Sequence, residues 1–111
     1  MFKGLFGSKK YASISPSEVK VKLDNKEKFL LFDVRSQTEY SGGHLEHSIN
    51  LPLQVITSVV TKYARSKDME IVVYCQSGAR SSRAAGVMAE MGYTNVKNMG
   101  GISSWRYAVV R

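Results

Sequence analysis

The single cysteine of this chain, Cys75, stands where an apolar run gives way to a short polar segment. The preceding residues 70–74 (EIVVY) are typical of a buried strand, and a helical pattern follows over residues 82–91. Backbone N–H groups of such a loop, together with the helix N-terminus, favour negative charge at one point. A thiol at that point has a lowered pKa and becomes a nucleophile near neutral pH.

The polar segment after the cysteine supports this chemistry. Gly78 permits a tight curl of the backbone, and Arg80 adds a fixed positive charge. The alternative is an inert core cysteine, which would have apolar neighbours on both sides. We therefore predict Cys75 as the catalytic nucleophile, in an anion-binding loop that comprises Gln76, Ser77, Gly78, Ala79, Arg80 and Ser81.

Two further charged residues, Asp33 and Arg35, end another predicted strand. Because ligands bind at the carboxyl ends of parallel strands, we expect both residues at the same edge of the sheet as Cys75. Asp33 could pair with Arg80 or accept loop N–H bonds, or it could serve as a helix N-cap or in a structural ion pair. Arg35 could pair with Glu39 or line the anion site.

Strand-like and helix-like segments alternate along the chain, and the central strands are apolar on both faces. This pattern predicts an α/β fold with an open parallel sheet covered by helices on both faces. Ser15 and Glu18 form a capping box that marks the start of the first helix. The expected elements are helix 16–24, strand 29–34, helix 51–63, strand 70–74, helix 82–91, strand 95–99, turn 100–101 and helix 103–110.

Several segments resemble the signatures of the rhodanese family of sulfurtransferases, in the order and spacing of that family. The resemblance covers roughly residues 11–107 and implies a rhodanese-like fold with a sheet of about five strands. The matching segments are residues 31–35 (LFDVR) with 39–40 (EY), 43–45 (GHL) with 48–52 (SINLP), 75–81 (CQSGARS), and 92–96 (GYTNV) with 100–105 (GGISSW).

The resemblance implies transfer of a sulfane sulfur from a donor such as thiosulfate through a Cys75 persulfide. The acceptor would be thiophilic: cyanide, or a protein or low-molecular-weight thiol. Some thiosulfate-preferring members of the family place basic residues directly after the cysteine. In this chain Gln76 and Ser77 are neutral, which leaves positive charge to Arg80 and Arg83. We expect no cofactor, and the histidines and the cysteine show no metal-ligand spacing.

Two other functions stay open. A rhodanese-like sulfur carrier or protein-interaction module with little small-molecule turnover would fit the neutral residues after Cys75. A Cys-dependent phosphatase of similar fold would hold one residue more between its cysteine and arginine than the four found here. This loop also contains no acidic residue. Its length therefore favours sulfur transfer over phosphate hydrolysis.

The length of 111 residues suits one domain, which we place at residues 11–111 after a basic and apolar N-terminal tail at residues 1–10. The tail lacks the features of a secretory signal, and a single cysteine suits a reducing compartment, so we expect a cytoplasmic protein. A net charge of +7 would attract small sulfur-containing anions. Because the basic residues are scattered and no apolar run is long enough, we expect neither a nucleic-acid partner nor a transmembrane segment.

Overall fold

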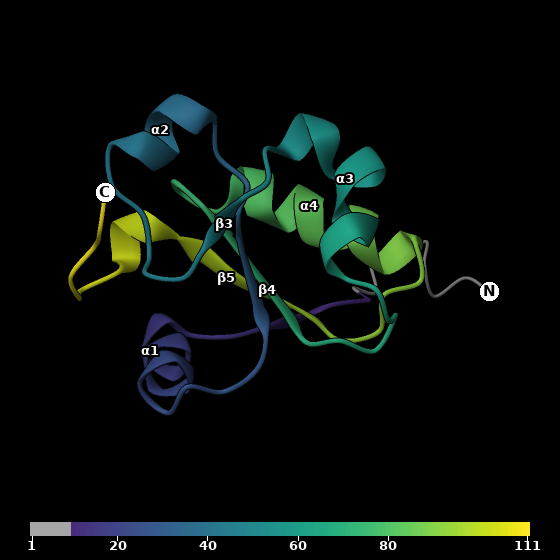
Figure 1. Ribbon diagram of the computed structural model, residues 1–111, viewed down its shortest axis with the longest axis horizontal. Coiled ribbons are helices and arrows are strands. Elements are labelled where there is room, and N and C mark those ends of the chain that lie inside the picture. The colour runs from purple at the N-terminus through teal and green to yellow at the C-terminus, as the bar shows by residue number, and fades with distance from the viewer. Residues whose placement is uncertain (1–9) are drawn as a thin grey trace.

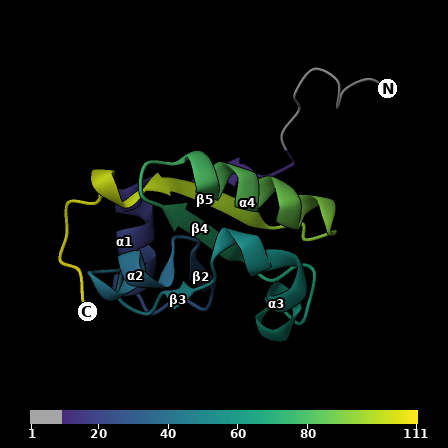
Figure 2. The same ribbon diagram turned by 90° about the horizontal axis from the view of Figure 1, so that it is seen from above.

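In a computed structural model that describes residues 10–111, the chain forms a five-stranded parallel sheet in the order β1-β5-β4-β2-β3. Helix α1 covers one face of the sheet, and α3 and α4 cover the other (Figures 1 and 2). The predicted α/β fold is thus confirmed. Most of the predicted N-terminal tail, residues 1–9, lies outside the described residues. The elements are β1 (Ala12–Ser13), α1 (Pro16–Asp24), β2 (Leu30–Asp33), α2 (Gln37–Ser41), β3 (Ile49–Asn50), the 3₁₀ turn η2 (Leu53–Val55), α3 (Ile56–Tyr63), β4 (Ile71–Cys75), α4 (Ala79–Glu90), β5 (Val96–Gly101) and the 3₁₀ turn η3 (Ile102–Ser104).

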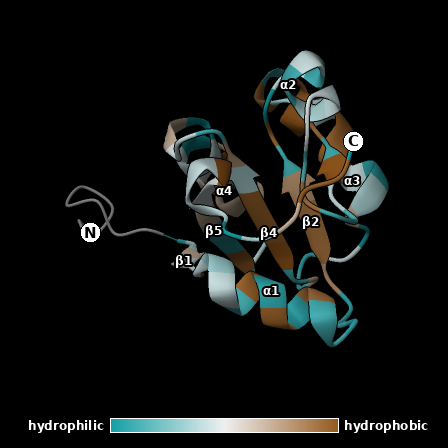
Figure 3. Ribbon diagram, turned by 90° about the vertical axis from the view of Figure 1, so that its left-hand side faces the viewer, coloured by the Kyte–Doolittle hydropathy of each residue, from teal (hydrophilic) through white to brown (hydrophobic). Residues whose placement is uncertain are grey.

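The central strand β4 is buried along its whole length, and its side chains alternate between two cores. Ile71, Val73 and Cys75 join the core beneath α3 and α4, whereas Val72 and Tyr74 join the core beneath α1. Figure 3 shows the hydrophobic character of β2 and β4 between these layers. Burial on both faces explains their continuous apolar runs, and it directs the Cys75 side chain toward α4.

Two predicted helices have different bounds in the structure. The helix predicted over residues 51–63 is divided into η2 and α3, and Pro52 before η2 has an extended backbone. Helix α4 begins earlier than predicted, because Gly78 adopts a φ of 112° and forms its N-cap. Ala79, Arg80 and Ser81 therefore belong to the first turn of α4 rather than to the loop.

The strand predicted over residues 95–99 forms as β5, but the two predictions for residues 100–110 were wrong. Residues 100–101, predicted as a turn, continue β5 and pair with the end of β4. The helix predicted over residues 103–110 does not form beyond η3. Instead, the backbone of Val110 pairs with that of His44 through hydrogen bonds of 2.8 and 2.9 Å. Pairing with segments distant in sequence thus outweighs the local helical preference.

Candidate active site

Cys75 is the last residue of β4, and the following loop curls back over its sulfur. The backbone N–H of Gly78 donates to Cys75 Sγ at 3.0 Å, and Ser81 Oγ lies 3.5 Å from the same sulfur. The left-handed backbone of Gly78 (φ 112°) makes this curl possible, as predicted for a glycine at this position. Only 1% of the surface of Cys75 is exposed, so the sulfur lies beneath the loop.

Burial acts to raise the pKa of the Cys75 thiol, but hydrogen bonds to the sulfur outweigh burial. The Ser81 hydroxyl and the backbone N–H groups of Ser81, Gly78 and Ser77 lower the pKa of Cys75 below its ordinary value. The Ser81 hydroxyl also lies within 3.1 Å of the Gly78 carbonyl oxygen. Because a hydroxyl has a single proton and rotates, Ser81 can turn that proton toward the sulfur when Cys75 ionises.

The guanidinium of Arg80 is held by a carboxylate. Its Nη1 and Nη2 donate to Glu39 Oε1 and Oε2 at 2.8 and 2.9 Å. Glu39 lies on α2, where its Oε1 also accepts the N–H of the N-cap residue Ser36. The Arg80 guanidinium first, and then the Ser36 N–H, lower the pKa of Glu39 to about 2. The positive charge predicted at Arg80 is therefore present, but it is paired with the negative charge of Glu39.

Asp33 and Arg35 pair with each other. Of the alternatives that the sequence left open, pairing of Asp33 with Arg80 and of Arg35 with Glu39 are therefore not the ones that the structure shows. Arg35 Nη2 donates to Asp33 Oδ2 at 2.7 Å, and Arg35 Nε contacts both carboxylate oxygens at 3.0 and 3.1 Å. Both side chains are buried. This is the structural ion pair that the sequence left open, and it reaches the loop because Arg35 Nη1 donates to Gln76 Oε1 at 3.3 Å.

The sequence reasoning missed the role of Glu39 as the partner of Arg80. A signal was present, since Ser36 and Glu39 have the spacing of a capping box, and the structure shows both of its hydrogen bonds. Recognising that box would have predicted α2. It would not have shown that Glu39 reaches Arg80, because this contact joins residues 41 positions apart.

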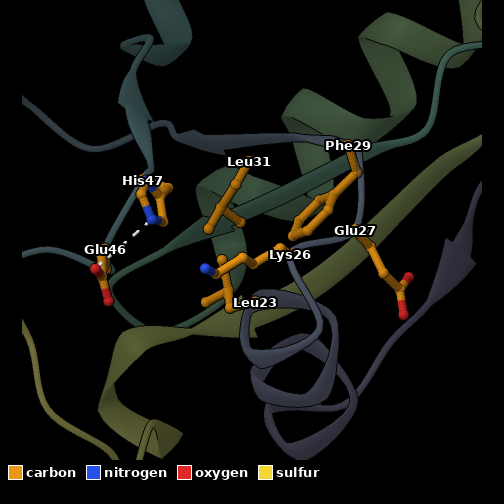
Figure 4. Close-up of a pocket in the computed structure, with 7 residues that line it drawn as sticks. All are labelled: Leu23, Lys26, Glu27, Phe29, Leu31, Glu46 and His47. Atoms are coloured by element: carbon orange, nitrogen blue, oxygen red, sulfur yellow. Dashed lines mark ion pairs between the residues drawn. The ribbon is translucent and has the colours of Figure 1, made fainter.

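A separate pocket of about 590 Å³ lies between the end of α1, the start of β2 and the segment before β3. Figure 4 shows Leu23, Phe29 and Leu31 among its lining side chains, with Glu46 and His47 beside each other at one side. Cys75 and the loop that follows it do not line this pocket. The candidate active site is the end of β4, where the loop surrounds the Cys75 sulfur.

Two observations concern residues 10–111 as a whole. No group of three or more His, Cys, Asp or Glu side chains in this part of the chain could hold a metal ion. None of its helices has both the length and the apolar character needed to cross a membrane.

Comparisons with known proteins agree with this geometry. A family model described as "Rhodanese-like domain" matches residues 15–108. Thiosulfate sulfurtransferase PspE of Escherichia coli is 36% identical over 70 residues, which cover 63% of this chain and 67% of that protein. A sulfurtransferase of Allochromatium vinosum is 33% identical over 93 residues, which cover 83% of this chain and 85% of that protein.

Solved structures share the fold. A rhodanese-related protein from Thermoplasma volcanium has a TM-score of 0.76 and 28% identity, with 90% of this chain and 98% of that chain covered. A rhodanese with anions from E. coli has a TM-score of 0.72 and 31% identity, with 76% and 99% covered. These relatives favour an enzyme over a carrier module or a phosphatase. By sequence, fold and named relatives, the chain belongs to the rhodanese family and is a sulfurtransferase that acts on sulfur-containing substrates.

Proposed function

We propose that Cys75 takes up a sulfane sulfur as a persulfide and then passes it to a thiophilic acceptor. The observation that carries this proposal is the hydrogen bond from the Gly78 N–H to Cys75 Sγ, 3.0 Å long, at the end of a buried strand. A thiolate stabilised in this way is nucleophilic near neutral pH. The relative named thiosulfate sulfurtransferase supports thiosulfate as a donor.

The proposed reaction has two displacement steps and needs no oxidant or reductant beyond its substrates. In the first, the Cys75 thiolate attacks the outer sulfur of thiosulfate, the sulfur–sulfur bond breaks, and sulfite leaves with the electron pair. In the second, cyanide or a thiolate attacks the outer sulfur of the persulfide. Thiocyanate or a new persulfide forms, and the Cys75 thiolate is restored. Preorganised N–H groups around the sulfur stabilise the negative charge in both steps.

We assign the anion-binding role to the loop Gln76, Ser77 and Gly78 and to the first turn of α4, which contains Ala79, Arg80 and Ser81. The hydrogen bond from the Gly78 N–H to the sulfur supports this assignment, and the N–H groups of Ser77 and Ser81 also help to lower the pKa of Cys75. Asp33 and Arg35 would act indirectly, because their ion pair is linked to the loop through Gln76.

We further propose that the substrates are small sulfur-containing anions. The acceptor in this proposal is a protein or low-molecular-weight thiol, and nucleic acid is not a partner. A cytoplasmic location suits a free thiolate, because reducing compartments keep such groups unoxidised.

We also propose that residues 11–111 form a single domain and that residues 1–10 are a tail. The family match over residues 15–108 supports the proposal that residues 11–111 form a single domain.

The experiment is intact-protein mass spectrometry before and after incubation with thiosulfate, with Cys75→Ala as a second sample. We expect a mass gain of one sulfur atom in the native protein and none in the variant. Subsequent cyanide should remove the added sulfur and release thiocyanate. A gain that persists in Cys75→Ala would refute the proposal. Persulfide that is released only to a protein thiol would instead favour the carrier module.

A further inference from the structure

The charged residues around the Cys75 loop cancel one another. Arg80 pairs with Glu39 at 2.8 and 2.9 Å, and Arg35 pairs with Asp33 at 2.7 Å. These two pairs carry no net charge, although the chain as a whole carries +7. Once Cys75 ionises, the positive potential at the sulfur comes from backbone N–H groups and the helix N-terminus.

The position of Arg80 makes its neutralisation relevant to the reaction. The Glu39 carboxylate most strongly, and the Cys75 thiolate as a further contributor, raise the pKa of Arg80. Arg80 lies in the first turn of α4 between Gly78 and Ser81, which contact the Cys75 sulfur at 3.0 and 3.5 Å, so the charge of Arg80 acts on the reacting sulfur from the same turn. Arg83, a turn further along α4, is exposed to solvent, where salt screens its charge.

We infer that Glu39 determines which sulfur donors the enzyme prefers, because it neutralises Arg80. Donors that carry a single negative charge near the sulfane sulfur, such as thiosulfonates and hydropersulfides, are favoured over dianionic thiosulfate. This inference rests on the proposed function. Glu39 acts through Arg80, and it is a specificity-determining residue rather than a catalytic one.

The physical reason lies in the number of charges that approach the thiolate. A dianion is repelled by the Cys75 thiolate about twice as strongly as a monoanion at the same distance. A free Arg80 would offset this repulsion, and its attraction would also be about twice as strong for the dianion. Glu39 removes most of that attraction, so the stronger repulsion between the dianion and the Cys75 thiolate is not offset.

Methanethiosulfonate is a suitable probe because it matches thiosulfate in chemistry but carries one negative charge fewer. The Cys75 thiolate attacks its outer sulfur, the sulfur–sulfur bond breaks, and methanesulfinate leaves with the electron pair. The same Cys75 persulfide forms from both donors. A difference between the two donors therefore reports on charge rather than on the sulfur that is transferred.

Glu39→Gln is the informative variant. A glutamine keeps an oxygen that can accept the Ser36 N–H, as in other capping boxes, so α2 should keep its N-terminus. It leaves Arg80 without a counter-charge. The matched control is Glu90→Gln at the other end of α4, which changes the net charge equally. This helix has 12 residues. Its length is about 18 Å, beyond the Debye length of about 10 Å at 0.1 M salt.

We expect Glu39→Gln to raise kcat/KM about fivefold for thiosulfate and about twofold for methanethiosulfonate, mainly through a lower KM. The gain should shrink as salt is added. Arg80→Gln should lower kcat/KM for thiosulfate relative to kcat/KM for methanethiosulfonate, because it leaves the Glu39 carboxylate without its positive partner. Taking the ratio within each variant cancels any general loss of activity.

The inference would be overturned if Glu39→Gln and Arg80→Gln each changed kcat/KM equally for the two donors. It would also be overturned if Glu90→Gln shifted the ratio of the two kcat/KM values as much as Glu39→Gln does. Mass spectrometry of the native protein separates this failure from failure of the proposed function. If neither donor loads Cys75 with sulfur, the proposed function is wrong. If both donors load it but the ratio does not move in the variants, the role of Glu39 alone is wrong.

Discussion

Gly101 lies against the backbone of Gln76, so closely that a Cβ at Gly101 would fall 2.5 Å from the Gln76 carbonyl oxygen. The same Cβ would lie 2.8 Å from Ser77 Cα. Gly101 has an ordinary extended backbone (φ −103°), so close approach rather than backbone freedom requires glycine here. Strand β5 and the active-site loop can therefore pack together only where β5 has no side chain.

Gly101→Ala should displace the loop, because both close contacts are backbone atoms that cannot rotate away. We expect kcat/KM to fall about tenfold or more, since small misplacements of reacting groups carry large penalties. The free energy of unfolding should fall by about 1–3 kcal/mol, as for other overpacked sites. Steady-state kinetics and urea unfolding measure the two effects.

Gly86→Ala is the matched control for this prediction. Gly86 lies within α4, and a Cβ there would have no atom outside its own helix within 4 Å. Alanine should therefore stabilise the protein by about 0.5–1 kcal/mol through its higher helix propensity and leave kcat/KM unchanged. If both alanine variants kept full activity, the contact at Gly101 would not position the loop.

Ser81→Ala should raise the pKa of Cys75, because it deletes the hydroxyl that stabilises the thiolate. Alkylation by iodoacetamide should then reach half of its maximal rate at a higher pH than in the native protein. Since Cys75 is the only cysteine, the reaction reports on this thiol alone. Ser82→Ala is the control, because that hydroxyl contacts Tyr11 instead. An unchanged pH profile in Ser81→Ala would show that backbone N–H groups alone set the pKa.

The central elements of the fold could be predicted from the sequence because their signals are local. The runs that became β2 and β4 are apolar since both faces of these strands are buried. Helix α1 carries its start signal in Ser15 and Glu18, and the structure shows both hydrogen bonds of that capping box. Because each of these residues ends a predicted strand, the sequence also predicted Cys75 and Asp33 at one edge of the sheet, and β4 and β2 end at these residues.

The parts that could not be predicted depend on contacts between distant segments. Residues 100–101 resemble a turn, yet they pair with the end of β4, and this pairing decides their conformation. The sequence likewise could not predict which charged residues pair with one another. Arg35 has carboxylates nearby in sequence at Asp33 and Glu39, and only the fold, which brings Glu39 on α2 within reach of Arg80 on α4, assigns Glu39 to Arg80.

Asp33→Asn should strongly destabilise the protein. It leaves the Arg35 guanidinium, which is 4% exposed, buried without a counter-charge. Removal of one partner from a buried pair typically costs about 3–5 kcal/mol. Asp24→Asn is the control, because it breaks an exposed pair with Lys20 and should cost less than about 0.5 kcal/mol. Urea unfolding at neutral pH compares the two variants, and similar losses in both would contradict a structural role for the Asp33–Arg35 pair.

The Glu39–Arg80 pair should also give the stability of the protein a specific dependence on pH. The pKa of Glu39 is about 2 in the folded chain, against an ordinary value of 4.5. Because the folded state binds this proton more weakly, the stabilisation is complete above pH 4.5 and is lost as the pH falls toward 2. Its size is about 1 kcal/mol once solvent screening of this partly exposed carboxylate is allowed for.

Urea unfolding at several pH values between 7 and 3 tests this dependence, with Glu39→Gln as the comparison. Native protein should be the more stable at pH 7, and its advantage should shrink at pH 3, because Glu39 is then protonated in the unfolded chain but still mostly ionised in the folded one. Arg80→Gln should remove most of the same pH dependence, since the guanidinium is the main cause of the low pKa. A difference between native protein and Glu39→Gln that stays constant from pH 7 to pH 3 would mean that the carboxylate gains nothing from Arg80 in the folded state.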